Sequence, residues 1–156
     1  MTGGSALSAS ASDTVATVVV PSGSLELGSG TTAVVLGTVT PGTSTMTALP
    51  GLTVKDNRAG TAGWTASVVV TDFTGRATGT SLSAAGATYA PLQASTAGTA
   101  TVTPSSATDL RAPKVVQTAT GVSGNNSATW TASLIVSVPP DTIADTYNAT
   151  LTYSLS

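Results

Sequence analysis

Two tryptophans are the side chains with the most distinctive chemistry in this chain, because each occurs in the same short motif. Residues 64–70 read Trp-Thr-Ala-Ser-Val-Val-Val, residues 130–136 read Trp-Thr-Ala-Ser-Leu-Ile-Val, and the 156 residues contain no third tryptophan. An indole ring can stack on the apolar face of a sugar, or it can anchor a hydrophobic core. Trp64 and Trp130 are each in register with the inward apolar positions of their expected strands, which favours the core.

Carboxylate and amide oxygens are the other groups that could bind a ligand. Calcium prefers such oxygen ligands, but the spacing D-x-D-x-D-G does not occur. In turns, aspartates also accept hydrogen bonds from local backbone N–H groups. A pair of carboxylates could hydrolyse a glycosidic bond, yet no acid lies in a recognisable motif. We therefore expect no enzyme activity, no cofactor and no specific metal site. The candidate oxygen ligands are Asp56, Asn57, Asp72, Asp141 and Asp145.

A Lys–Asn isopeptide bond is a further chemical possibility that the residue types leave open. Lys55 or Lys114 could join Asn148 with the help of a nearby aspartate. The exact mass of the protein would then be lower by one ammonia.

Composition excludes several classes of function. Histidine and cysteine are absent, which removes imidazole acid–base catalysis, thiolate chemistry and thiol-rich zinc sites. Only 8% of residues are charged, and the five Lys and Arg residues are scattered, so no basic patch favours nucleic acid or anionic lipid. No apolar run is long enough to span a bilayer. The start of the chain has no signal-peptide pattern, and we expect a mature secreted domain, with a cytosolic N-terminus as the alternative.

Alternation of apolar and polar residues predicts the elements that must position these side chains. Period-two alternation is typical of half-buried antiparallel strands. It is clearest in the two tryptophan strands and in the C-terminal stretch 147–155. Residues 76–110 contain few large apolar side chains, so we expect short strands, long loops and local mobility there. The other expected strands cover residues 13–20, 25–27, 33–36, 52–55 and 114–117.

These patterns predict an all-β protein. With about nine to eleven short strands and frequent turn signals, we expect an antiparallel β-sandwich of the Ig-like, Greek-key type. Residues 1–12 are small and polar and are predicted to form a flexible N-terminal segment. Residues 13–156 are predicted to form a single domain.

Three stretches resemble the WxL-type domain, and more closely the WxL-like secreted proteins of actinobacteria. They read Leu-Pro-Gly-Leu-Thr-Val-Lys-Asp-Asn-Arg at 49–58, Gly-Trp-Thr-Ala-Ser-Val-Val-Val-Thr-Asp-Phe at 63–73 and Tyr-Asn-Ala-Thr-Leu-Thr-Tyr-Ser-Leu at 147–155. The resemblance spans roughly residues 24–156. The chain departs from the pattern in two places, since Ala66 stands where leucine is expected and Tyr153 where tryptophan is expected.

The resemblance implies an extracellular, cell-wall-associated domain that binds peptidoglycan or an attached glycan without a covalent bond. The residues expected to face such a ligand or partner are Trp64, Trp130, Asn57, Arg58 and Tyr153. The alternative is a structural subunit that forms a homo-oligomer or pairs with another surface protein. The valine-rich stretch 14–20 favours this alternative if it lies at a sheet edge, because the unpaired N–H and C=O groups of an edge recruit another strand.

Overall fold

The computed structural model describes residues 10–28 and 37–156, and within them regular structure consists of antiparallel strands and one short 3₁₀ helix. The strand expected at 33–36 and most of the expected flexible segment 1–12 lie outside the described residues. The elements are β1 (Leu25–Gly28), β2 (Ser44–Asp56), β3 (Trp64–Val70), β4 (Phe73–Gly75), β5 (Ser81–Leu82), η1 (Ala84–Gly86), β6 (Ala87–Pro91), β7 (Ser95–Pro104), β8 (Ala107–Thr108), β9 (Lys114–Ser137), β10 (Tyr147–Asn148) and β11 (Leu151–Leu155).

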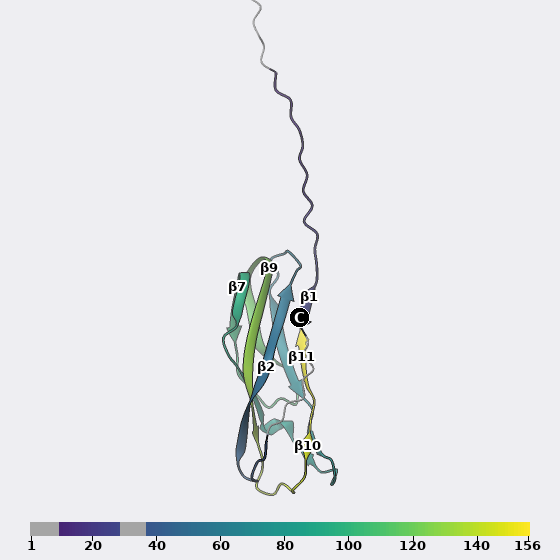
Figure 1. The fold of residues 1–156 in the computed structure, drawn as a ribbon, viewed down its shortest axis with the longest axis vertical. Helices are drawn as coiled ribbons and strands as arrows, with labels where there is room; N and C mark the ends of the chain where they lie inside the picture. The colour runs from purple at the N-terminus through teal and green to yellow at the C-terminus, as the bar shows by residue number, and fades with distance from the viewer. Residues whose placement is uncertain (1–9, 29–36) are drawn as a thin grey trace, which may run out of the picture.

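Strand β9 organises the main sheet because it pairs with four other strands. Strands β2 and β3 follow one another along one of its edges, and β6 and β7 follow one another along the other. The order β1-β2-β9-β3-β11 ends in two strands that lie beside each other, so the main sheet is nearly closed and barrel-like (Figure 1). A small second sheet has the order β10-β4-β5. The expectation of an all-β antiparallel protein is confirmed.

The expectation that every strand is short is wrong for β9, which joins the expected strand 114–117 to the second tryptophan strand through the Gly/Ser/Asn residues between them. Its 24 residues include Gly121 and Gly124, whose φ angles of 60° and 76° let the backbone bend within the strand. The pairing with β7 shifts register at Gly98 and Thr99 but is not interrupted. The middle of the chain likewise supplies β6 and β7 rather than mainly loops, because these strands pair along β9.

The C-terminal stretch 147–155 was predicted to be one strand and is instead divided between the two sheets. Tyr147 and Asn148 pair with β4, whereas residues 151–155 pair with β3. The predicted face of alternate apolar residues is present, but Tyr147, Leu151 and Tyr153 are only half-buried. This stretch therefore closes the edges of the sheets and does not lie at their centres.

The predicted first strand, residues 13–20, is wrong. Residues 10–23 have no regular secondary structure and are exposed, and Figure 1 shows them extending away from the sheets. Val15, Val18, Val19 and Val20 are 89, 86, 79 and 72% exposed. A strand needs a neighbour to pair its N–H and C=O groups, and the described part of the chain offers none here. We call residues 10–21 the N-terminal arm.

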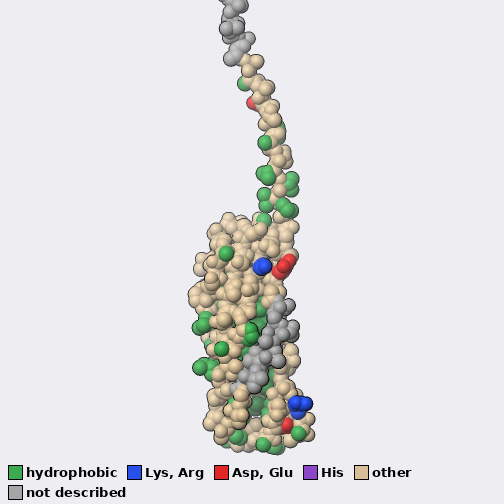
Figure 2. All heavy atoms as spheres, viewed as in Figure 1, with side chains coloured by type: hydrophobic (Ala, Val, Ile, Leu, Met, Phe, Trp, Pro, Cys, Tyr) green, Lys and Arg blue, Asp and Glu red, His purple; other side chains and the backbone are tan. Residues whose placement is uncertain are grey.

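The core confirms the inward register of the tryptophan strands. Trp64 and Trp130 are each 2% exposed and share one cluster of buried side chains with Leu52 and Val54. A second buried cluster, toward the other end, contains Phe73 and other large apolar side chains. The visible surface is mostly polar and uncharged (Figure 2). Within the described residues, no helix is long and apolar enough to cross a membrane.

Candidate functional site

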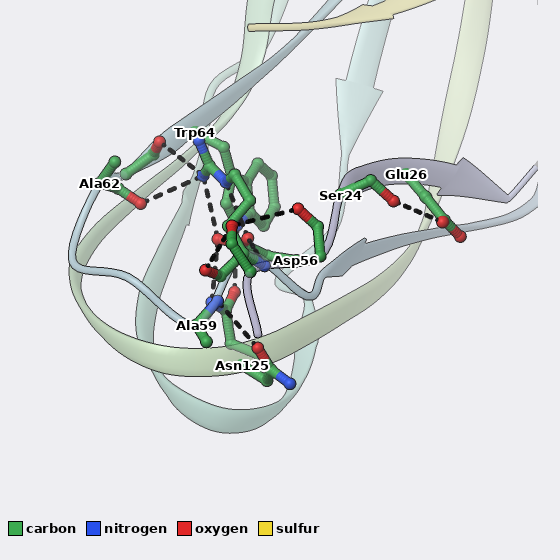
Figure 3. Close-up of polar contacts among 12 residues, drawn as sticks. Ser24, Glu26, Asp56, Ala59, Ala62, Trp64 and Asn125 are labelled. Carbon is green, nitrogen blue, oxygen red and sulfur yellow. Dashed lines mark hydrogen bonds and ion pairs between the residues drawn. The ribbon is translucent and has the colours of Figure 1, made fainter. Parts of the chain in front are cut away.

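A buried carboxylate lies at the end of the sheet from which the arm departs. Asp56 is 2% exposed and is held by Arg58, whose Nε and Nη2 lie 2.8 and 3.0 Å from its two oxygens (Figure 3). The Asn126 amide donates to the same carboxylate at 3.2 Å. Trp64 Nε1 in turn donates to Asn126 Oδ1 at 3.1 Å. We call Asp56, Arg58, Trp64, Asn125 and Asn126 the arm-end cluster.

The same cluster closes the loop 57–63 that joins β2 to β3. Arg58 Nη2 donates to the carbonyl oxygens of Ala62 and Gly63 at 3.2 and 3.1 Å. Asn125 Oδ1 accepts the backbone N–H of Ala59 at 3.0 Å, with Ala59 held at a φ of 54°. One guanidinium and one amide thus fix a loop whose own residues form no regular structure.

The electrostatics of the cluster are those of a satisfied ion pair. The hydrogen bond from Arg58 lowers the pKa of the Asp56 carboxyl below its ordinary value of 3.8, and burial opposes this effect. Both Asp56 oxygens and the Asn126 side chain have partners within the protein. Because the Asp56 carboxylate and the Asn126 amide have their partners within the protein, this part of the cluster stabilises the fold.

A second series of hydrogen bonds passes through the core and includes Trp130 and Tyr153, the other two residues predicted to face a ligand. Trp130 Nε1 donates to Tyr89 Oη at 3.1 Å, and Tyr89 Oη lies 3.0 Å from Tyr153 Oη. The two tyrosine rings meet edge to face, 5.9 Å apart. Burial raises the pKa of both phenols, so both stay neutral at physiological pH and their hydroxyls can serve as both donors and acceptors.

The structure therefore divides the five predicted ligand-facing residues into two groups. Asn57 and Arg58 lie with Trp64 at the arm end, whereas Trp130 and Tyr153 meet through Tyr89. Both indole rings are buried, which confirms the core-anchor interpretation and leaves no ring face for a sugar in this structure. Sequence reasoning missed Asn126 and Tyr89, although an Asn pair in a glycine-rich stretch and one of only three tyrosines were available as signals.

Two of the candidate oxygen ligands, Asp145 and Asp72, accept hydrogen bonds from other segments of the chain. Asp145 accepts the N–H groups of Ala77, Thr78 and Thr146, together with the hydroxyl of Thr78. Asp72 accepts the N–H of Ala84. Within residues 10–28 and 37–156, no three acidic, histidine or cysteine side chains gather to hold a metal ion.

The candidate isopeptide partners lie in different sheets. Asn148 is in β10 of the small sheet. Lys55 and Lys114 are in β2 and β9 of the main sheet.

Two cavities lie at opposite ends of the molecule. One, of about 280 Å³, is beside the arm-end cluster and is lined by Lys55, Asn57, Asn125 and Ser127, among others. The other, of about 350 Å³, lies between residues 80–83 and the loop 139–143.

No protein-family model, curated protein or solved structure matches this chain. The function must therefore be inferred from the molecule's own geometry. Its main features are the arm, the arm-end cluster and the two cavities.

Proposed function

We propose that this protein is a non-catalytic structural subunit of a bacterial cell surface that joins a neighbouring protein through its N-terminal arm. The observation that carries the proposal is the exposure of the arm: four valines within six residues are each at least 72% exposed. Contiguous exposed apolar surface is a frequent mark of a protein interface. Burying a valine side chain contributes about 1.5 kcal/mol or more.

The composition of the arm suits pairing as a strand. Residues 14–20 are Thr, Val and Ala only, so they favour the extended pleated conformation and carry no charge. Proline first occurs at position 21, which leaves every backbone N–H of 14–20 able to donate to another strand. Residues 14–20 of the arm lack the lysine or internal proline that blunts exposed strands in other proteins.

The root of the arm is fixed to the arm-end cluster, which supports a specific role for Asn57 and Arg58. Gly23 N–H donates to the Asn57 carbonyl at 2.8 Å, and Asn57 N–H donates to the Ser24 carbonyl at 2.9 Å. Ser22 Oγ donates to the Arg58 carbonyl at 3.1 Å. We propose that these two residues serve a partner indirectly, by holding the arm at a defined position and direction.

Sedimentation velocity over a range of concentrations tests the proposal. The wild-type protein is expected to sediment faster as its concentration rises, and Val18→Asp is expected to abolish this behaviour. Thr17→Asp is the matched control, since it adds the same charge to a polar position of the arm. Both variants should keep the melting temperature of the wild type because the arm contacts no core residue. A wild-type protein that stays monomeric at all concentrations, and that no surface protein recruits, would refute the proposal.

A second candidate function is association with a cell-wall glycan, and the cavity at the arm end favours it. Its lining carries the amides of Asn57 and Asn125, the hydroxyl of Ser127 and the ammonium of Lys55. Such groups hydrogen-bond sugar hydroxyls. Co-sedimentation with purified sacculi tests this function. Asn57→Ala should reduce pelleting, whereas Thr74→Ala at the opposite end should not, and equal pelleting of both variants would contradict the role of this cavity.

We propose a family, a finer fold class and a location for the protein as well. Membership of the WxL-like family, an Ig-like Greek-key sandwich and an extracellular, wall-associated location are supported by the quoted sequence stretches and by a charge-poor, cysteine-free composition. A pull-down on intact Gram-positive cells, followed by protease shaving, would test the location.

A further inference from the structure

The cavity at the end opposite the arm has the character of a peptide-binding slot. Four apolar side chains line it, and at its mouth Ile143 is 56% exposed. Hydroxyl groups such as that of Ser81 stand among them, and the only charge in the lining is Asp141. Its volume of about 350 Å³ lies within the usual range for ligand pockets. We call this cavity the slot, and its apolar residues are Leu82, Pro139, Ile143 and Tyr147.

One wall of the slot is a strand with an open edge. Residues 81 and 82 form β5, the last strand of the small sheet, and within the described residues β5 pairs only with β4. An extended peptide can bind such an edge through its backbone and place alternate side chains in an adjoining pocket. The slot supplies that pocket, and its four apolar side chains, set among hydroxyl groups, could contact a valine.

From these features we propose that the arm of one copy binds in the slot of the next copy, so that the chains assemble head to tail. This inference rests on the proposed function, because it names the partner and the acceptor of the arm. The arm is uncharged over residues 14–21, and the slot carries one acid at its rim. The contact therefore contains no ion pair, and assembly should be nearly insensitive to salt.

Chain length requires that the slot belong to a second copy. Gly23 is held to Asn57, which follows Asp56, the partner of Asn126 in β9. From Asn126, β9 runs a further 11 residues to Ser137, just before the slot. At about 3.3 Å per residue this distance is roughly 36 Å. Val15 is eight residues from Gly23, and an extended chain of that length spans at most about 28 Å. Figure 1 shows the arm leaving the end of the molecule opposite β10.

Two other strands at the edges of the main sheet, β7 and β1, are less suited to accept the arm. Along β7, the Gln93 side chain donates to the Val102 carbonyl at 2.7 Å, and Pro104 has no N–H to offer. Strand β1 carries a charged side chain, Glu26. Proline and charge are among the usual devices that block pairing at an edge.

An arm in one copy and a slot in the next form a contact that does not close on itself. Because donor and acceptor lie at opposite ends, repetition of the contact generates an open chain of subunits, whereas a twofold dimer would pair like surfaces. Head-to-tail assembly therefore predicts species larger than dimers as the concentration rises.

Complementation by sedimentation velocity tests this contact. Val18→Asp removes a functional arm and Ile143→Asp removes a functional slot, so each variant alone should be monomeric. Mixed in equal amounts they should form a dimer and nothing larger, because the intact arm of one fits the intact slot of the other. Leu92→Asp is the matched control: Leu92 is 61% exposed but lies away from the slot, and this variant should assemble like the wild type.

The outcomes separate the inference from the proposed function. If Ile143→Asp assembles as well as the wild type while Val18→Asp does not, the arm has another acceptor and only the slot is refuted. If Val18→Asp also assembles, both ideas fail. Two monomeric variants that do not combine would overturn the slot as the acceptor of the arm. As an independent measurement, a synthetic peptide of residues 12–22 should shift the amide NMR signals of residues 80–83 in Val18→Asp, with affinity at least about tenfold weaker for Ile143→Asp.

Discussion

Replacing Arg58 by alanine is expected to destabilise the protein far more than replacing Arg111, although the two arginines make nearly the same ion pair. Each bonds both oxygens of the aspartate two residues before it, with shortest distances of 2.8 Å to Asp56 and 2.7 Å to Asp109. The two ion pairs differ in the burial of their aspartate side chains. The Asp56 side chain is 2% exposed and that of Asp109 is 42% exposed.

The size of the destabilisation follows from the hydrogen-bond donors that Asp56 keeps after the substitution. Arg58→Ala leaves a buried carboxylate with two remaining donors, and breaking a buried pair costs about 3–5 kcal/mol. Because the Arg58 side chain is itself 30% exposed, water can partly replace it, and we expect a loss of about 2–3 kcal/mol. For a domain of this size the melting temperature should fall by roughly 5–10 °C. Arg111→Ala should leave the melting temperature close to that of the wild type.

Thermal unfolding at several pH values provides the assay. The pKa of Asp56 is lowered in the folded protein, so its stabilising contribution is complete above the ordinary value of 3.8 and is lost as the pH falls through the lower folded value. The difference between Arg58→Ala and the wild type should therefore be largest near pH 7 and shrink below pH 3.8. If the Arg58 and Arg111 variants melt at the same temperature, burial of the carboxylate does not set the strength of the pair.

Three further substitutions test other contacts. Tyr89→Phe removes the acceptor of the buried Trp130 N–H and should cost about 1–3 kcal/mol in urea unfolding; an unchanged midpoint would mean that another acceptor replaces it. Asp145→Asn should speed amide exchange at Thr78, because the Asp145 carboxylate accepts both the N–H and the hydroxyl of Thr78; unaltered exchange would contradict this role. Ala59→Gly relieves a φ of 54° and should stabilise the protein by up to about 1 kcal/mol, so a lower melting temperature would count against strain there.

Local alternation was enough to predict the two tryptophan strands, 64–70 and 130–136, and which face of each is buried. The burial pattern of β3 alternates over all seven residues, as the sequence of 64–70 predicts. The same reasoning failed for residues 13–20, because period-two alternation describes a segment that can pair and says nothing of whether a neighbour is present. Local alternation also predicted that the strand beginning at Lys114 ends at residue 117, whereas β9 continues to Ser137. Glycine and asparagine can bend a paired strand as well as stop one.

The candidate site was predictable only in part. Trp64, Asn57 and Arg58 were identified because they surround a repeated motif. Their partner Asn126 lies 62 residues from Trp64 and 70 from Asp56, and no local pattern specifies contacts at that separation. The slot was not predicted at all, because it joins residues 80–83 to the loop 139–143 through the packing of two distant segments.

The sequence by itself therefore determined an all-β chain, the inward side of its strands and the absence of imidazole and thiol chemistry. These properties depend on residue type and on neighbours one or two positions away. Only the tertiary structure decided that the main sheet nearly closes, that the buried carboxylate is paired, and that the valine-rich arm and the slot lie at opposite ends. Those features depend on which distant strands share hydrogen bonds, and that choice is made by the fit of the whole sheet and not by any one segment.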